Sequence, residues 1–357
     1  MSENTGKMKL SEKFQRGLSS FAGKMGSNIY VVTIRDAMLA YVPFTFIASI
    51  FLILSCFPIE QVNDFVSYIL QCDAAVWQGK LQYVYNASIA IGGLLVAVTT
   101  SHTLAEKLKL SQLQVTLTAL ICFLILTPLV KAEATDAISL TSVSAQSMFC
   151  AILTGIFAAK IYQLIDRKNI KIKMPSAVPP AVSAPFESLI PSLITITVFW
   201  IVRLILDAFG TDAVSLINGT LGLPLIFVGG SLPGMIFVSV FQQILWFFGI
   251  HGSSIVSGVM TPVLQVLEDQ NKNLSLMGEL PTNIICQSFF SHFVCFGLSS
   301  AVIAALIVAK SKRYREIAKI SVVPFAFNVG EPALFGFPMV LNFDLLIPFI
   351  LVQPVSA

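Results

Sequence analysis

The stretch AMLAYVPFTFIASIFLILSCFPI, residues 37–59, runs for 23 residues without a charged side chain. A helix of about 20 apolar residues is long enough to cross the hydrocarbon core of a bilayer. The sequence contains further apolar runs at residues 84–101, 113–130, 145–165, 186–208, 231–250 and 284–309, and a last run that reaches Ala357. It therefore predicts an all-α polytopic membrane protein with about eight to nine spans.

The composition supports the same class of protein. Of 357 residues, 55% are hydrophobic and only 11% are charged, whereas about 25% are charged in a soluble domain. So few charged side chains cannot cover a soluble globule of this size, which argues against a soluble enzyme, a nucleic-acid-binding protein and a disordered chain. The 6 cysteines are scattered without metal-ligand spacing, so we expect no metal, no disulfide framework and no cofactor.

Lysine and arginine are concentrated in alternate connections between the runs. The N-terminal segment through Arg35 holds six of them, and residues 160–173 and 310–319 hold five each. Cytoplasmic loops carry this excess, so the N-terminus is predicted to be cytoplasmic. Residues 12–31 are consistent both with an interfacial amphipathic helix and with a disordered basic N-terminus.

Two stretches do not fit straight spans. Between the sixth and seventh runs the chain must cross back, yet its only apolar part, residues 254–267, is short and contains Gly258 and Pro262. The second stretch, residues 320–337, contains two prolines and two glycines. Broken backbone at membrane depth must be buried in protein or line a wet cavity, and a pair of breaks is typical of a transporter site. We therefore predict two re-entrant or broken-helix elements.

A proline-rich segment, residues 175–191, separates two halves of the chain. The first half, residues 1–174, contains four of the runs and neither break. The second half, residues 175–357, contains both breaks. This organisation predicts a membrane scaffold domain followed by a transport domain.

Three side chains in or beside the breaks are candidates for ligand binding. His251 follows the sixth run in WFFGIHG (246–252), where its imidazole can bind a polyol or cap a helix end. Glu331 lies in the second break, where a carboxylate can hold or deprotonate a hydroxyl, or can cap the helix that begins at Pro332. Trp246 is equally consistent with stacking on a sugar ring and with an aromatic belt at the interface.

Other polar residues in the runs are predicted to be structural. Arg203 and Asp207 are four residues apart in the fifth run, so on a helix their side chains face one another. We expect them to form an ion pair at the membrane interface. Structural or interfacial roles are also expected for His102, His292 and Asp344.

Three stretches taken together resemble a known family: WFFGIHG (246–252), PPAVSAPFESLIP (179–191) and FNVGEPALFGFPMVLN (327–342). They look like the membrane-embedded IIC permease component of the phosphoenolpyruvate-dependent sugar phosphotransferase system. The closest branch is the lactose/N,N′-diacetylchitobiose/β-glucoside (cellobiose) family. The resemblance covers essentially the whole chain.

The resemblance implies a homodimer in the bacterial inner membrane, with an N-terminal dimerisation domain and a C-terminal transport domain. It implies import of a β-linked disaccharide of the cellobiose, chitobiose and lactose class. A separate IIB protein, itself charged by IIA, would supply the phosphoryl group, so the donor residue is not on this chain. Trp246 and His251 match the family's sugar-contacting positions, and Asn328 matches the first asparagine of its Phe-Asn-Ile-Asn-Glu-Pro motif. Glu331 matches the acid of that motif, which the resemblance places beside the hydroxyl that receives phosphate. We therefore expect all four residues to bind the sugar and Glu331 to be the catalytic residue.

The sequence departs from the family at two places, and two other functions remain open. Gly330 stands where the family usually has a second asparagine, which affects the expected choice of sugar. The chain ends at Ala357 inside an apolar run, so we expect a fragment or a C-terminally truncated product. The alternatives are an ion-coupled secondary transporter and a truncated permease subunit that regulates a full-length partner without transporting.

Overall fold

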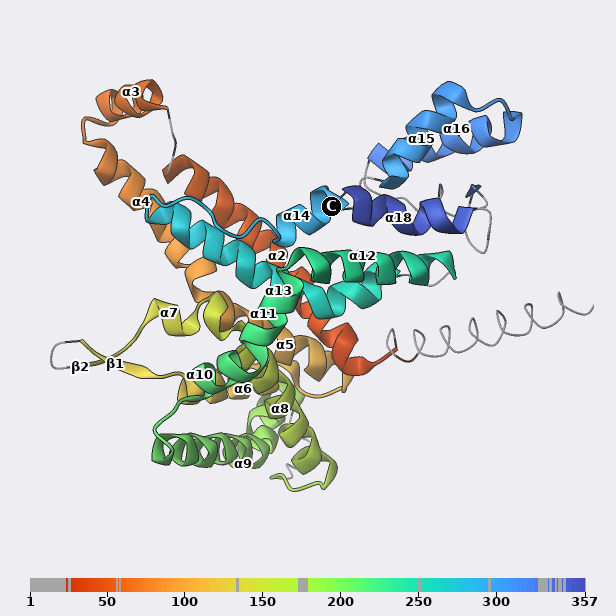
Figure 1. The fold of residues 1–357 in the computed structure, drawn as a ribbon. Helices are drawn as coiled ribbons and strands as arrows, with labels where there is room; N and C mark the ends of the chain where they lie inside the picture. The colour runs from red at the N-terminus through yellow and green to blue at the C-terminus, as the bar shows by residue number, and fades with distance from the viewer. Residues whose placement is uncertain are drawn as a thin grey trace, which may run out of the picture. The chain divides into compact units, whose positions relative to one another are not determined.

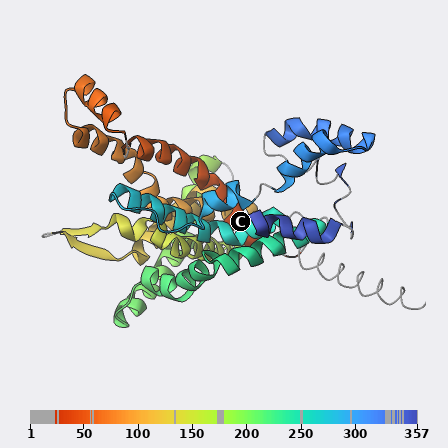
Figure 2. The ribbon, with the colours of Figure 1, turned by 45° about the horizontal axis from the view of Figure 1, so that its top comes forward.

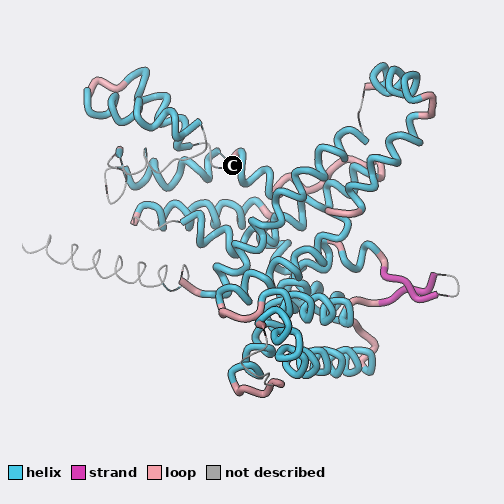
Figure 3. Tube along the Cα trace, turned by 180° about the vertical axis from the view of Figure 1, so that it is seen from behind, coloured by secondary structure: helices cyan, strands magenta, loops and turns pink. Residues whose placement is uncertain are grey.

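The computed structural model describes residues 27–55, 59–132, 135–172, 179–248, 252–294, 297–326 and 345–356, with Lys24, Phe57, Ala333, Gly336, Phe337, Met339 and Asn342. This part of the chain is almost entirely helical (Figure 1). Its one sheet is an antiparallel hairpin of β1 (Leu129–Ala132) and β2 (Thr135–Ile138), the magenta segment in Figure 3. The predicted all-α class is confirmed for the described residues.

These residues pack into two compact units. The larger unit comprises residues 32–227 and 261–283, and the smaller unit comprises residues 1–31, 228–260 and 284–357. Three of the four boundaries between the units fall inside helices, namely α2 (Ile29–Ser55), α11 (Leu223–Gly229) and α13 (Gly252–Leu276). The expected division at residue 174 separates a scaffold domain from a transport domain by their functions. It stays a prediction.

The larger unit is built around α5 (Gly92–Lys107), α6 (Gln112–Leu126) and α8 (Met148–Arg167), which pack on one another. Small residues let these helices approach closely. A Cβ on Gly155 of α8 would lie 3.0 Å from Thr100 Cβ and 3.2 Å from the Ala97 carbonyl oxygen of α5. Because apolar side chains gain little by leaving lipid, such close packing is a main source of helix association in membranes. The other elements of this unit are α3 (Glu60–Leu70), α4 (Ala74–Asn86), η1 (Ile89–Ile91), α7 (Leu140–Val143), η2 (Ala145–Ser147), α9 (Pro180–Ala208), α10 (Ala213–Ile217) and η3 (Asn218–Gly222).

Helix α9 packs against α6 and α8 and carries the predicted ion pair. Arg203 Nε lies 2.8 Å from Asp207 Oδ1, which confirms the expected pairing one helical turn apart. The same guanidinium donates to the carbonyl oxygens of Ile125 (3.1 Å) and Thr127 (2.9 Å) at the end of α6. These carbonyls have no partner within their own helix, so Arg203 joins two helices as well as pairing with Asp207.

An ion pair also spans the connection from α8 to α9. Lys171 Nζ lies 2.9 Å from Glu187 Oε2 and 3.5 Å from Asp166 Oδ1. The hydrogen bond to Glu187 raises the pKa of Lys171 above its ordinary value. The proline-rich segment expected here as a connection is helical from Pro180 onward. Proline is well tolerated in a first helical turn because its missing N–H would be unpaired there.

The number of spans differs from the sequence expectation. Four described helical stretches are long and apolar enough to cross a membrane, at residues 29–55, 74–107, 145–167 and 182–208. A fifth results if the helices of residues 213–229 and 232–247 form one broken span. The expected count of eight to nine is not confirmed, because several apolar runs give short helices: α6, α14 (Gln287–His292), α15 (Gly297–Val308) and α18 (Leu346–Ser356). Most of the N-terminal stretch 12–31 lies outside the described residues.

The smaller unit contains α12 (Leu232–Phe247), which packs along α18 (Figure 2). It also contains α15, which packs against α16 (Lys312–Ala326). The turn before α12 is tight, because a Cβ on Gly234 would collide with the Val228 carbonyl oxygen. Ser231 closes this turn, since its hydroxyl oxygen accepts from the Gly234 N–H at 3.2 Å.

The first expected break is one long helix. Instead of a half-helix over residues 254–267, α13 runs for 25 residues, from Gly252 through Pro262 to Leu276. The apolar run ends near residue 267, but the helix continues because its polar side chains find buried partners. The half-helix interpretation was therefore wrong about its length.

The structure describes only the first residues of the second expected break. Residues 320–326 are the last turns of α16, which continues past Pro324. Most of residues 327–344 lie outside the described residues, including Asn328 and Glu331. The break itself stays a prediction.

Candidate functional site

Trp246 is the one predicted sugar-binding residue that the structure describes. It lies in the last turn of α12, half-buried, and its indole Nε1 donates to the Ser253 hydroxyl at 3.1 Å. Ser253 belongs to the first turn of α13. The indole N–H therefore links the two helices on either side of His251.

Gly252 makes this approach of α12 and α13 possible. A Cβ at this position would collide with the Gln242 carbonyl oxygen and would lie 3.1 Å from Trp246 Cδ1. His251 and the two residues before it lie outside the described residues.

Replacing Gly252 with alanine is expected to destabilise the protein by about 1–3 kcal/mol, the range for overpacking a well-packed site. Sugar binding should weaken in parallel, because α12 and α13, which flank His251 in the sequence, would be pushed apart. Thermal unfolding and sugar titration of the purified chain in detergent would measure both effects. The matched control is Gly79→Ala, because a Cβ on Gly79 meets nothing within 4 Å. If the two variants unfold at the same temperature and bind sugar equally well, the close contact at Gly252 does not constrain the approach of α12 and α13.

Two adjacent buried amides lie on α12, about one helical turn before Trp246. Gln243 Nε2 donates to the Phe349 carbonyl oxygen at 2.8 Å, and Gln242 Nε2 lies 3.4 Å from Gln353 Oε1 of α18. The Gln242 side-chain oxygen has no hydrogen-bond partner among the described residues. The sequence signal for these buried amides was a pair of adjacent glutamines inside an apolar run. The prediction from sequence did not include them.

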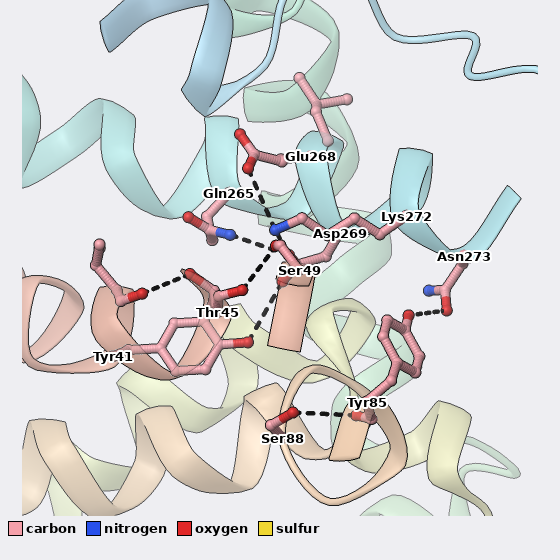
Figure 4. Close-up of polar contacts among 12 residues, drawn as sticks. Tyr41, Thr45, Ser49, Tyr85, Ser88, Gln265, Glu268, Asp269, Lys272 and Asn273 are labelled. Carbon is pink, nitrogen blue, oxygen red and sulfur yellow. Dashed lines mark hydrogen bonds and ion pairs between the residues drawn. The ribbon is translucent and has the colours of Figure 1, made fainter. Parts of the chain in front are cut away.

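A second polar cluster lies on the C-terminal half of α13, inside the larger unit (Figure 4). Its centre is Asp269, whose side chain is fully buried. Gln265 Nε2 donates to Asp269 Oδ1 at 2.9 Å, and the Tyr41 hydroxyl of α2 lies 3.5 Å from Oδ2. Lys272 Nζ lies 3.5 Å from Asp269 Oδ1 and 3.2 Å from Glu268 Oε1. We call these five residues the Asp269 network.

Further hydrogen bonds lie next to this network in the segment 261–283. The Tyr85 hydroxyl of α4 donates to Asn273 Oδ1. Asn271 and Asn283 bond reciprocally, with Asn271 Nδ2 to the Asn283 carbonyl oxygen at 2.7 Å and the Asn283 N–H to Asn271 Oδ1 at 3.0 Å. The segment 261–283 is thus linked to α2 and α4 by the Tyr41 and Tyr85 hydrogen bonds, whereas its ion pairs lie within α13.

The sequence reading missed the Asp269 network. None of its five residues was a candidate from the sequence, whereas the structure largely buries Lys272 in ion pairs on α13. The signal was the spacing of Gln265, Glu268, Asp269 and Lys272, which places all four on one side of a helix. Since Gln265 and Lys272 already contact the Asp269 carboxylate, the network holds the helix in place rather than forming an open ligand site.

The comparisons with known proteins decide the family. Residues 35–352 match the family model described as "Phosphotransferase system, EIIC". The chain belongs to this family. The family predicted from the three motifs is therefore confirmed, and EIIC components are integral membrane proteins of sugar phosphotransferase systems.

Individual relatives of this EIIC chain agree with the family model. The lichenan permease IIC component of Bacillus subtilis (strain 168) is 32% identical over 363 residues, covering 98% of this chain and 80% of that protein. The cellobiose-specific EIIC component of Geobacillus stearothermophilus is 34% identical over 339 residues, covering 90% and 74%. A crystal structure of the transporter ChbC, the IIC component from the N,N′-diacetylchitobiose-specific phosphotransferase system, matches with a TM-score of 0.87 and 33% identity, covering 94% of this chain and 81% of that one.

The other predicted site residues of the EIIC chain are only partly placed by the structure. His251, Asn328 and Glu331 lie outside the described residues, so the expected meeting of His251 and Glu331 in one pocket stays a prediction. His292 Nδ1 lies 2.8 Å from the Ser288 carbonyl oxygen within α14, which agrees with a structural role. His102 is exposed on α5, and Asp344 lies outside the described residues.

Proposed function

We propose that this EIIC chain binds a β-linked disaccharide of the cellobiose, chitobiose and lactose class and imports it for phosphorylation by a separate IIB protein. The observation that carries the proposal is the match to ChbC, whose fold covers 94% of this chain at a TM-score of 0.87. Relatives named for lichenan and cellobiose support the same class of sugar.

Within this proposal, the sugar is held by Trp246, His251, Asn328 and Glu331. Trp246 offers an aromatic ring to the apolar side of a pyranose, and the other three offer hydrogen bonds to hydroxyls. The chain works as a homodimer in the bacterial inner membrane with its N-terminus in the cytoplasm. Residues 1–174 form the scaffold and dimerisation domain, and residues 175–357 form the transport domain.

The division of chemistry follows from what phosphoryl transfer requires. The reaction depends on positioning and on stabilising charge more than on covalent help from the acceptor side. A membrane subunit therefore has to bind the sugar, present one hydroxyl to the cytoplasmic donor and exclude water. Glu331 orients that hydroxyl or accepts its proton. The phosphorylated product carries new negative charge, which a carboxylate-lined site repels, so the sugar is released inside.

The test combines sugar binding with phosphorylation. The purified chain in nanodiscs is titrated with cellobiose, N,N′-diacetylchitobiose and lactose, with α-linked maltose as the control sugar. The chain is then placed in vesicles with IIA, IIB and phosphoenolpyruvate. We expect binding of at least one β-linked disaccharide in preference to maltose, and product that appears as sugar phosphate only when IIB is present. Uptake of free sugar that an uncoupler abolishes and that does not need IIB would contradict the proposal and favour an ion-coupled carrier.

A further inference from the structure

The turn between α15 and α16 carries an unusual concentration of positive charge. Residues 310–319 contain five lysines and arginines and one acid. Two of the bases are used locally: Arg315 Nη2 donates to the Ala309 carbonyl oxygen at 3.0 Å, and Lys319 Nζ pairs with Glu316 Oε1 at 2.8 Å. The other three are Lys310, Lys312 and Arg313, which we call the basic turn.

The basic turn is exposed and has no ion-pair partner in the part of the chain that the structure describes. Local helix stability does not explain these bases. Lys312 and Arg313 lie in the first turn of α16, where a helix carries partial positive charge and favours acidic side chains. Two bases at this end repel both the helix dipole and each other. An external anion would remove this repulsion.

An exposed apolar surface adjoins the basic turn. Ile303 and Ile307 lie one turn apart on α15 and are 56% and 73% exposed, and Val308 is 70% exposed. The opposite side of α15 packs on α16 through Val302 and Ala318. On α16 itself Ile320 is 70% exposed. Apolar side chains that lead directly to unpaired bases are typical of a boundary between hydrocarbon and lipid headgroups.

We propose that Lys310, Lys312 and Arg313 form a binding site for the phosphodiester headgroup of an anionic phospholipid, with Ile307 and Val308 against its acyl chains. A phospholipid matches both parts of this surface. Its negative phosphate can contact the basic turn, and its acyl chains, which begin directly beside the headgroup, can contact Ile307 and Val308. An acidic protein would neutralise the bases but would offer no apolar group to Ile307 and Val308. The adjacency of exposed apolar and basic side chains therefore favours lipid over a protein partner.

The test measures lipid binding to the full chain in detergent by native mass spectrometry. Wild type and Lys310→Gln/Lys312→Gln/Arg313→Gln are titrated with phosphatidylglycerol and with phosphatidylcholine. Each basic residue near an anionic surface contributes about 1 kcal/mol, so we expect affinity for phosphatidylglycerol to fall about fivefold per base and about a hundredfold in the triple variant. Binding of phosphatidylcholine should change little, and inorganic phosphate should not displace the bound lipid.

Two control variants test whether the affinity for phosphatidylglycerol depends on positive charge at these three positions rather than on the total charge of the chain. Lys310→Arg/Lys312→Arg/Arg313→Lys keeps the charge and should keep the affinity for phosphatidylglycerol. Lys80→Gln/Lys131→Gln removes exposed charge elsewhere in the chain and should also leave the affinity unchanged. The proposal is overturned if the triple glutamine variant binds phosphatidylglycerol as wild type does. It is equally overturned if that variant keeps its lipid and loses only phosphorylation with IIB, since the surface would then be a protein docking site.

Discussion

Replacing Lys272 with methionine is expected to lower the free energy of unfolding by about 3–5 kcal/mol, the usual cost of leaving a buried charge without its partner. Methionine keeps an apolar stem of similar length and removes only the ammonium group. That group lies 3.2 Å from Glu268 Oε1 and 3.5 Å from Asp269 Oδ1, and only 12% of the Lys272 side chain is exposed. The fully buried Asp269 carboxylate would then lose its contact with the ammonium group. Denaturation of the full chain in detergent measures the loss.

Two further variants make this expectation specific to the buried pair. Lys80→Met removes an exposed lysine of α4 and should change stability by no more than about 0.5 kcal/mol. Lys272→Met/Asp269→Asn should recover most of the loss, because the amide keeps an oxygen for Gln265 and removes the unpaired charge. If Lys272→Met and Lys80→Met unfold alike, the ion pairs of the Asp269 network do not hold α13 in place.

Hydropathy located helices well where a helix is both apolar and capped within its own sequence. The run at residues 37–59 corresponds to α2, Ile29–Ser55, which begins earlier than the run. The reason is local, because the Asn28 side-chain oxygen accepts from the Tyr30 and Val31 N–H groups at 2.9 and 3.3 Å. An asparagine before a helix is a sequence-level start signal, so this boundary could have been predicted.

Helices that depend on distant partners could not be placed in the same way. Asp269 contacts Tyr41, which lies 228 residues earlier in the chain. A hydropathy profile records the charge of Asp269 and predicts a loop, because it has no information about which side chain will neutralise that charge. The prediction of one span at residues 284–309 was wrong for a different reason, because the structure has two helices there, α14 and α15. The uniform hydropathy of this run predicts burial in lipid or protein but not where the helix is interrupted.

At the candidate site, too, the sequence predicted which residues matter but not the contacts between helices. Short motifs around Trp246 and Glu331 were enough to predict the family, because they combine residue types that few folds need together. The hydrogen bond from Trp246 to Ser253 and the close contact at Gly252 depend on how α12 meets α13. These contacts arise from tertiary packing, which no motif encodes.

Replacing Glu331 with glutamine is expected to lower the rate of sugar phosphorylation by about 10²–10⁴, the contribution of a positioned general acid or base. The amide has nearly the shape of the carboxylate, but it cannot accept the proton of the hydroxyl that receives the phosphoryl group. Sugar affinity should fall less, by about tenfold, because hydrogen bonds to a charged group contribute about 1.5–3 kcal/mol and the amide retains part of this. Phosphorylation with IIA, IIB and phosphoenolpyruvate gives the rate, and equilibrium titration gives the affinity.

The difference between rate and affinity identifies the role of Glu331. Glu279→Gln is the matched control, because Glu279 is exposed beyond the end of α13 and the same change there should alter neither quantity. Equal losses of rate and affinity in Glu331→Gln would mean that the carboxylate only binds sugar, since a group acting only in the transition state lowers the rate alone. His251→Ala, which removes a binding side chain without an expected proton-transfer role, should weaken affinity more than the maximal rate. If both Glu331→Gln and His251→Ala bind sugar as wild type does, the two residues do not share one sugar site, and the assignment of the second half of the chain as the transport domain loses its chemical basis.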